Sequence, residues 1–374
     1  MNIPITGANS QLDNIKRASN IECLRCMAML FIILNHCILY IATKQLSLDV
    51  EPINFCLTDF AYQVVYNGVN IFVLISGYFL VKTTRNTTNW EKVTKLWLSV
   101  FFYSVIIYIC SIEIHWESFD LQKLIHILMP IRYDSYWFIT QYLGLYIMSP
   151  FLAKWARSMS KQEYKIMLVS FFIITSIIQL QGLKGGFSLI WFLFIFMFAG
   201  YIQLWENKSA TIKKWNTYAG IIFIFISILL FLISFPINGR TLNIVSYWGF
   251  YNGPLLFIAS VSLFLSFRKM KESKLVTAIS KLSPYMFGVY LVHENPIVKE
   301  HLWSYLNRQF TEVRISDLLF ISIIILLLSA FIEYLRQLIF KTLKIDSLFY
   351  HIIKNTFSLI TTILKKQFHK CLVH

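Results

Sequence analysis

Residues 17–37 read RASNIECLRCMAMLFIILNHC and open the first of several long apolar runs in a chain of 374 residues. From residue 21 to 43 this run is long enough to cross a bilayer as a helix, which needs about 20 residues. It also carries three ionisable side chains, Glu22, Arg25 and His36. Such groups are costly inside a span, so they are candidates for function. The stretch therefore predicts a membrane helix with a site within it.

Nine further apolar runs of similar length follow, and the one at 282–298 is the least apolar. They lie at 61–81, 96–112, 136–153, 166–181, 187–205, 217–235, 247–267, 282–298 and 317–340. Hydrophobic residues make up 57% of the chain and charged residues 14%, whereas charged residues reach roughly 25% in a soluble domain. One soluble core could not bury so much apolar surface. We predict an all-α, polytopic transmembrane helical bundle of about ten spans.

The net charge of +15 is distributed as the positive-inside rule requires. If the N-terminus is cytoplasmic, the inner segments hold 25 Lys and Arg residues and the outer loops hold eight. This bias predicts that both termini are cytoplasmic and that the number of spans is even. Because the basic residues fall in short clusters between apolar runs, the charge indicates a membrane orientation and no nucleic-acid partner.

The spans divide the chain into three parts. We predict a cytoplasmic N-terminal segment over 1–20, a transmembrane domain over 21–340 and a basic amphipathic cytoplasmic tail over 341–374. The tail is expected to lie against the lipids of the anionic inner leaflet. Two long outer loops, near 113–135 and 299–316, are candidates for ordered elements.

Arg25 and His36 are eleven residues apart, which is close to three full helical turns, so both should face the same side. The helical rise separates them by roughly 16 Å, with Arg25 at the inner rim and His36 deeper in the bilayer. Glu22 lies one turn before Arg25 and can pair with it. A cation at the rim suits a phosphorylated donor and a buried imidazole suits a general base. Alternatively, Arg25 extends to the lipid headgroups and His36 bonds a neighbouring helix.

Two other stretches hold candidate substrate-binding residues. In LSPYMFGVYLVHENP (282–296), His293, Glu294 and Asn295 precede a proline near the outer end of a span. They either sit at the membrane interface or line an acceptor cavity. In SYWFITQYLGLYIMSPF (135–151), Tyr136 and Trp137 either belong to an aromatic belt or stack on a sugar ring. The residues alone do not separate these alternatives.

The sequence predicts no metal and no permanently bound cofactor. Cys23 and Cys26 have CxxC spacing, but they lie in an apolar helix with no second Cys or His pair. The six cysteines show no disulfide-framework spacing. Phosphate-binding loops, HExxH and GxSxG motifs are also missing from the sequence.

Four ordered segments of this chain resemble the acyltransferase-3 family of membrane acyltransferases. Residues 17–37 are similar to the family's opening, with Arg17, Glu22, Arg25 and His36 at its characteristic positions. GVNIFVLISGYFLV (68–81) resembles its second-span signature. Two later family segments are similar to the stretches that begin YWFITQYLGLYIMSPFL and LSPYMFGVYLVHENPIV. The resemblance covers about residues 17–340.

This resemblance implies ten or so spans, an acyl-CoA donor (usually acetyl-CoA) from the cytoplasm and a carbohydrate or lipid-linked glycan acceptor. By carry-over, His36 is the catalytic base or a transient acyl carrier. Arg25 holds the donor or the active conformation, and Glu22 supports it. The expected contacts with the donor are basic residues at the inner side, namely Arg17, Arg25, Lys82 and Arg85. Many members have an acidic residue where this chain has Asn70, and the basic run after that motif is thinner here.

We therefore expect an O-acetyltransferase of a bacterial surface polysaccharide, such as a capsule or O-antigen, in the cytoplasmic (inner) membrane. A transporter or flippase of a lipid-linked sugar is the alternative, although the paired broken helices typical of many transporters are not evident. A third hypothesis is a non-catalytic scaffold or sensor in a polysaccharide assembly complex.

Overall fold

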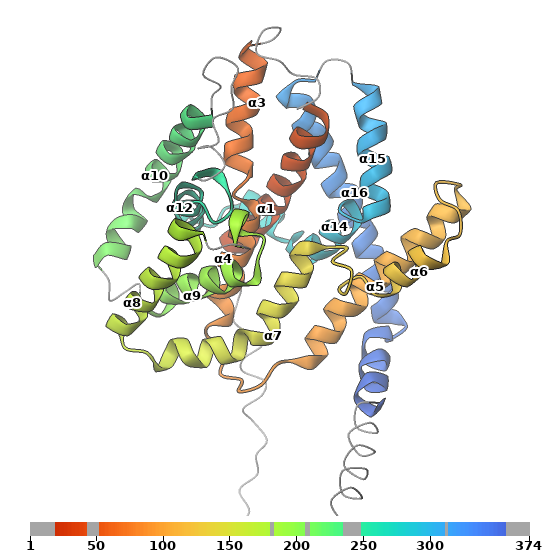
Figure 1. The fold of residues 1–374 in the computed structure, drawn as a ribbon, viewed down its shortest axis with the longest axis horizontal. Coiled ribbons are helices and arrows are strands. Elements are labelled where there is room, and N and C mark those ends of the chain that lie inside the picture. The colour runs from red at the N-terminus through yellow and green to blue at the C-terminus, as the bar shows by residue number, and fades with distance from the viewer. Residues whose placement is uncertain are drawn as a thin grey trace, which may run out of the picture.

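The computed structural model describes residues 19–42, 52–179, 183–205, 210–234, 248–310 and 313–356. These residues form helices and no strand (Figure 1). The prediction of an all-α fold is confirmed. Arg17 lies outside the described residues.

The helices follow one another along the chain with short connections. In order they are α1 (Ser19–Cys37), η1 (Ile38–Ala42), α3 (Pro52–Val65), α4 (Gly68–Leu80), α5 (Trp90–Glu113), α6 (Leu121–Leu128), α7 (Trp137–Ser158), α8 (Lys161–Phe172), η2 (Ile173–Ile178), η3 (Lys184–Gly186), α9 (Leu189–Trp205), α10 (Ala210–Ser234), α12 (Pro254–Lys269), α13 (Lys274–Ser280), η5 (Ser283–Tyr285), α14 (Met286–His293), α15 (Pro296–Gln309) and α16 (Ile315–Thr342).

Each predicted apolar run overlaps at least one of these helices. Six segments of the described chain are long and apolar enough to cross a membrane: Ser19–Ala42, Pro52–Leu80, Trp90–Glu113, Thr211–Ser234, Lys274–His293 and Ile315–Thr342. The helix Leu189–Trp205 is apolar but shorter. The chain is a polytopic α-helical membrane protein, and the count of ten spans stays a prediction.

The predicted span at 282–298 has different bounds in the structure. The apolar segment begins earlier, at Lys274, and its last helix ends at His293. A new helix, α15, starts at Pro296. Proline has no backbone N–H and is favoured at the first position of a helix. Asn295 caps that helix, with its side-chain oxygen accepting from the backbone N–H groups of Ile297 and Val298. Local capping therefore ends this span before residue 298.

Both candidate outer loops contain helices, α6 in 113–135 and most of α15 in 299–316. On the inner side α16 ends at Thr342, and residues 345–356 are again helical. Residues 357–374 of the predicted tail lie outside the described part. Its contact with the inner leaflet stays a prediction.

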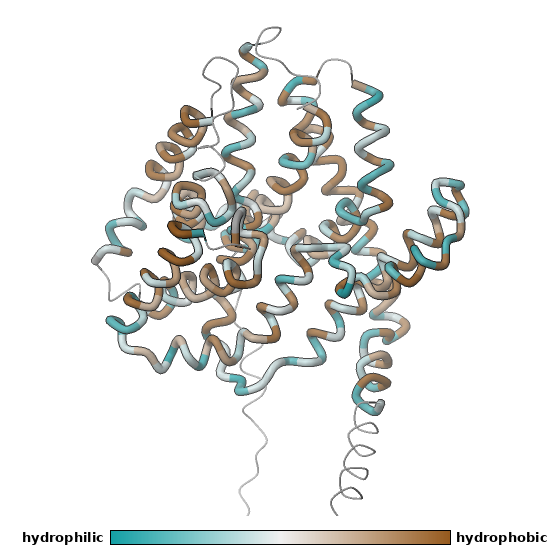
Figure 2. Tube along the Cα trace, viewed as in Figure 1, coloured by the Kyte–Doolittle hydropathy of each residue, from teal (hydrophilic) through white to brown (hydrophobic). Residues whose placement is uncertain are grey.

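Helix α1 lies at the centre of the bundle and packs against α3, α4, α12, α13, α14 and α16 (Figure 1). Close packing depends on small residues. A Cβ on Gly68 of α4 would lie 2.8 Å from the backbone oxygen of Ala28 in α1. In contrast, α10 and α16 expose rows of large apolar side chains, and Figure 2 shows both helices as mostly hydrophobic. In a bilayer those rows would face lipid, so α1 is held away from it.

Candidate functional site

His36 lies in the last turn of α1, where the regular helix gives way to a π-helix, η1 (Ile38–Ala42). Short π-helical segments often occur at functional sites because they redirect side chains. The side chain of His36 is 15% exposed. The first span thus presents an almost enclosed imidazole at its irregular end, which the charge pattern predicts to be the outer end.

The triplet His293-Glu294-Asn295 forms the break between α14 and α15. His293 is the last residue of α14, Glu294 follows as its C-cap, and Asn295 caps α15. The Asn295 amide also donates to the hydroxyl of Tyr136, 2.8 Å away. That hydroxyl donates in turn to the backbone oxygen of Leu291, 3.2 Å away. Tyr136 is 3% exposed, so these two hydrogen bonds hold the junction between α14 and α15 from inside the protein.

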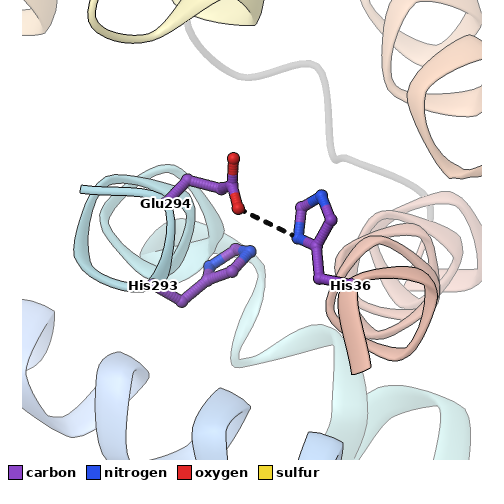
Figure 3. Close-up of side chains that lie close together, drawn as sticks. All are labelled: His36, His293 and Glu294. Carbon is purple, nitrogen blue, oxygen red and sulfur yellow. Dashed lines mark ion pairs between the residues drawn. The ribbon is translucent and has the colours of Figure 1, made fainter. Parts of the chain in front are cut away.

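This break lies directly beside the end of α1. The Nδ1 atom of His36 lies 3.2 Å from the Oε1 atom of Glu294, at ion-pair distance (Figure 3). These two atoms do not have the alignment of a hydrogen bond. Catalytic hydrogen bonds are often poorly aligned before substrate binds and tighten in the complex. The structure therefore brings together a histidine and a carboxylate that the sequence placed in separate motifs.

The hydrogen-bond partners indicate which ring nitrogens are available. The Nδ1 atom of His293 lies 2.6 Å from the backbone oxygen of Val289, so it carries the proton and donates. Its Nε2 atom is then a buried acceptor, and it has no partner among the described residues. In His36 the Nδ1 atom faces Glu294, which leaves Nε2 to accept a proton. The centres of the His36 and His293 rings are 5.5 Å apart.

Lys299 lies beside the cluster formed by His36, His293 and Glu294. Its Nζ atom donates to the second oxygen of Glu294 over 3.0 Å and lies 5.3 Å from the ring centre of Tyr40. Burial lowers the pKa of Lys299, but the Glu294 carboxylate outweighs it, and the pKa is raised above its ordinary value. Lys299 therefore stays cationic at neutral pH and offsets the charge of the carboxylate.

A small cavity of about 30 Å³ adjoins His36 and Glu294. Its wall includes Trp137, Tyr251 and Tyr290. Trp137 also contacts the ring of Phe187 at 4.8 Å. Of the two aromatic residues predicted as a sugar platform, Trp137 thus lines a cavity beside the histidine, whereas Tyr136 supports Asn295.

The inner end of α1 holds the second part of the predicted site. Glu22 lies 3.3 Å from Arg25 and accepts a hydrogen bond from the hydroxyl of Ser283. The predicted pairing of Glu22 with Arg25 is confirmed. Glu22 contacts η5 and His36 contacts the end of α14, two parts of one neighbouring segment. Glu22 and His36 therefore face the same neighbouring segment, and the predicted common side of Arg25 and His36 stays a prediction.

A large cleft opens on the side of the molecule that holds the basic clusters predicted to be cytoplasmic. Its volume is 810 Å³, and a second cavity of 260 Å³ shares Arg85 and Lys92 with it. Lys82 lines only the smaller cavity, and Arg25 lines neither. Two of the predicted donor-binding residues thus meet at these cavities, while Arg25 is tied to Glu22 instead.

The side chains of His36, His293 and Glu294 could also bind a metal ion. Among the described residues, one ligand atom each from His36, His293 and Glu294 lie within 4.8 Å of one another. Two histidines and a carboxylate are a ligand set that zinc uses. Lys299, however, already binds this carboxylate and places a cation beside the same cluster. The absence of a metal stays a prediction.

The structure also shows residues that the sequence did not single out. Tyr40, Lys299 and Trp303 lie around the His36–Glu294 pair, and spacing along the chain gave no sign of it. Glu333 and Arg336 form a buried ion pair at 2.7 Å within α16, beside the large cleft. Two charges of opposite sign at i and i+3 in an apolar run were the signal for that pair.

A histidine and a carboxylate lie in contact inside a helical membrane bundle, beside a cleft lined by basic residues, and this arrangement suits group transfer. The model of the acyltransferase-3 family, described as an acyltransferase domain, matches residues 19–334. This chain belongs to that family and is a multi-pass membrane acyltransferase. No curated protein and no solved structure gave a significant match.

The family assignment gives Asn70 particular interest, because many members are acidic there. In this chain Asn70 is fully buried in α4 and donates to the backbone oxygen of Tyr251 over 2.8 Å. Its side-chain oxygen accepts from the indole of Trp191 over 3.1 Å. The amide connects three parts of the bundle and needs both a donor and an acceptor, so an Asp could not replace it without loss.

Proposed function

We propose that this chain is an O-acetyltransferase of the bacterial cytoplasmic membrane. It moves an acetyl group from acetyl-CoA to a hydroxyl of a surface polysaccharide or of its lipid-linked precursor. The observation that carries the proposal is the contact of His36 Nδ1 with Glu294 Oε1 at 3.2 Å. It leaves the other ring nitrogen of His36 free to act as a general base.

In this reaction the Nε2 atom of His36 takes the proton of the acceptor hydroxyl. The oxygen attacks the thioester carbonyl, a C–O bond forms and the C–S bond breaks. The leaving CoA thiolate takes the proton from the imidazolium. Glu294 holds the ring in position and stabilises its charged form while the proton is on it, as carboxylates do for histidine bases in other acyl transfers. Lys299 keeps the carboxylate from being a lone buried charge.

The basic cleft supports a donor that carries phosphates. Arg85, Lys92 and Lys341 are among its lining residues, and guanidinium and ammonium groups bind phosphate well. Phe287 of α14 also lines this cleft. The helical rise places it about 9 Å along the axis from His293. An extended pantetheine arm can cover that distance from the cleft to the His36–Glu294 pair.

The size of the cavity beside His36 supports a short acyl group. A volume of about 30 Å³ exceeds the ≳ 10–15 Å³ needed for one water. It is far below the volumes typical of drug-sized ligands, about 300–1,000 Å³. Its aromatic wall would exclude a long acyl chain, so acetyl is the donor group we favour.

Replacing His36 tests this function. In His36→Ala, glycan O-acetylation in cells and acetyl transfer by vesicles should fall by about 10²–10⁴-fold, the usual contribution of a general base. NMR of the surface glycan scores the O-acetyl signals, and consumption of radiolabelled acetyl-CoA scores the donor.

A matched control is His301→Ala, which changes a histidine of α15 that stacks on Trp116 and has no contact with the pair. Its transfer should stay close to wild type. Normal glycan acetylation in a strain carrying His36→Ala would contradict the mechanism. Sugar translocation in vesicles without acetyl-CoA consumption would indicate a transporter instead.

A further inference from the structure

Glu333 of α16 is a buried carboxylate that the proposed acetyl transfer does not use. It is 2% exposed, and an ionisable group within a span is a candidate for function. The hydroxyl of Tyr103 and the Nε atom of Arg336 donate to its Oε2 atom over 2.7 and 2.8 Å. The Nη2 atom of Arg336 and the Nε2 atom of Gln337 donate to its Oε1 atom over 2.7 and 2.8 Å. With these hydrogen bonds and a matched charge, the carboxylate is fixed in place.

Helix α14 packs against both α16 and α5 (Figure 1). Gly288 of α14 has no room for a Cβ atom, because that atom would overlap the Cγ, Cδ and Oε2 atoms of Glu333. The amide of Gln337 also donates to the backbone oxygen of Pro284 over 3.2 Å. Glu333 and its partner Gln337 therefore hold the segment 284–288 from the side of α16.

The same segment and the same carboxylate form one wall of the large cleft of 810 Å³. The lining residues of that wall are Pro284, Tyr285, Phe287, Glu333, Arg336 and Gln337. Because Arg336 matches the charge of Glu333, this wall adds no net charge, unlike the basic side of the cleft. The wall contributes shape, and its shape depends on where α14 lies.

The other end of α14 carries the proposed catalytic pair. His293 is its last residue, and Glu294 follows as its C-cap. Glu294 lies six residues after Gly288, which is about 9 Å along the helix axis. A regular helix of this length moves as a rigid element, so a shift at Gly288 also displaces Glu294 from His36. A misplacement of about 1 Å can cost about 10²-fold in rate.

We propose that Glu333 is a positioning residue for acetyl transfer. Through its contact with Gly288 it fixes α14, so that the wall of the cleft and the His36–Glu294 pair keep the spacing that the reaction needs. This inference rests on the proposed function and extends it to a residue that acts through α14. In the alternative, the cluster only ties α5, α14 and α16 together, and its disruption lowers stability without changing the turnover of the folded protein.

The test adds one methyl group against the carboxylate. In Gly288→Ala, kcat for acetyl transfer should fall by about 10²-fold, whereas KM for acetyl-CoA should change little because the basic side of the cleft is intact. Alanine favours a helix more than glycine does, so helix propensity cannot cause the loss. The assay uses inside-out membrane vesicles, radiolabelled acetyl-CoA and the strain's own glycan. Turnover is counted per molecule of inserted protein, and thermal unfolding of the purified variant gives its stability.

The matched control is Gly200→Ala in α9. A Cβ atom there would lie 2.9 Å from the buried hydroxyl of Tyr164, and Gly200 lines neither the large cleft nor the cavity beside His36. Gly200→Ala should lower thermal stability, as Gly288→Ala does, but it should keep kcat close to wild type. A loss of kcat in Gly288→Ala alone thus separates positioning from a structural role.

A double variant tests whether the carboxylate is the group that acts. In Gly288→Ala/Glu333→Ala the overlap is gone and the added methyl group fills part of the vacated space, so kcat should recover about tenfold over Gly288→Ala. If Gly288→Ala does not insert into the membrane, Glu333→Gln decides instead. It keeps the shape of the side chain but loses the hydrogen bonds to one oxygen, so kcat should fall about tenfold at unchanged KM.

Three results would overturn the positioning role and leave the proposed function standing, provided that transfer still depends on His36. They are a normal kcat in Gly288→Ala, a raised KM for acetyl-CoA at normal kcat, and no recovery in the double variant. Where Glu333→Gln decides, a normal kcat in that variant overturns the role. No acetyl transfer by wild-type vesicles would instead contradict the proposed function itself.

Discussion

The two ends of α1 carry similar polar residues but engage them in different ways. At the inner end Glu22 binds Ser283 and Arg25. There the amide of Asn20 donates to the backbone oxygens of Phe267 and Arg268 over 2.9 and 3.0 Å. These contacts tie α1 to the ends of its neighbouring helices.

At the other end of α1, His36 and Glu294 both line the cavity of about 30 Å³. The Nε2 atom of His293 and the indole N–H of Trp303 are buried without a partner among the described residues. The contact between Glu294 and His36 lacks the alignment of a hydrogen bond, and so does the contact between Glu22 and Arg25 at the inner end. Because both ends of α1 carry charged groups, a charged group within a span does not by itself mark a reacting site. Ionisable groups that line a cavity, as His36 and Glu294 do, are the stronger signal, because a ligand can reach them.

The largest expected effect comes from changing one glutamate at each end. Glu294→Gln keeps the shape of the side chain but cannot stabilise a charged His36 ring, so kcat should fall by about 10²-fold. Lys299 also loses its carboxylate partner, but its side chain is 33% exposed and keeps water as a partner, so stability should fall only a little. Glu22→Gln should instead lower the free energy of unfolding by about 1–3 kcal/mol, because Arg25 loses its carboxylate partner. Acetyl transfer and thermal unfolding of the two purified variants check both expectations.

This pair of variants can break the comparison. If Glu22→Gln lost as much kcat as Glu294→Gln while unfolding like wild type, the inner cluster would act in the reaction. In that case Glu22 and its contact with Ser283 would take part in acetyl transfer, as the resemblance to the family implied for Glu22.

A polar residue that is fully satisfied inside the bundle should behave like the inner end. Asn70→Asp removes the donor to Tyr251 and buries a charge, so it should lower the free energy of unfolding by about 3 kcal/mol. The control is Asn89→Asp, since Asn89 only caps α5, where Asp serves equally well. Thermal unfolding in the same detergent measures both. Equal stability of the two variants would show that Asn70 is not the structural link inferred here.

The smallest expected effect concerns a metal at the outer end. Because Lys299 places a cation against Glu294, we expect no metal among His36, His293 and Glu294. Incubation with EDTA should then leave acetyl transfer unchanged, and elemental analysis of the purified protein should find no stoichiometric zinc. Loss of transfer that added zinc restores would assign a metal role to this cluster and would sharpen the contrast with the inner end.

Much of this protein is determined by local features of its sequence. Apolar runs of spanning length set the all-α membrane fold, because each residue's transfer into lipid contributes independently of distant partners. The spacing of Glu22, Arg25 and His36 set their common side, since helical periodicity is local. The break at Asn295 and Pro296 also has a local cause, the capping of α15 by Asn295, although the predicted apolar run at 282–298 extended past it.

Only the tertiary structure decided what stands beside His36. Its partner Glu294 lies 258 residues further along the chain, and their contact depends on how α1 packs against α14 and how η1 packs against α15. The same packing placed Lys299 and Trp303 around the pair and left the indole N–H unsatisfied. Contacts between distant segments depend on the packing of whole helices, which residue spacing does not encode. The sequence thus predicted that α1 carries a site, and the fold decided which groups lie beside its histidine.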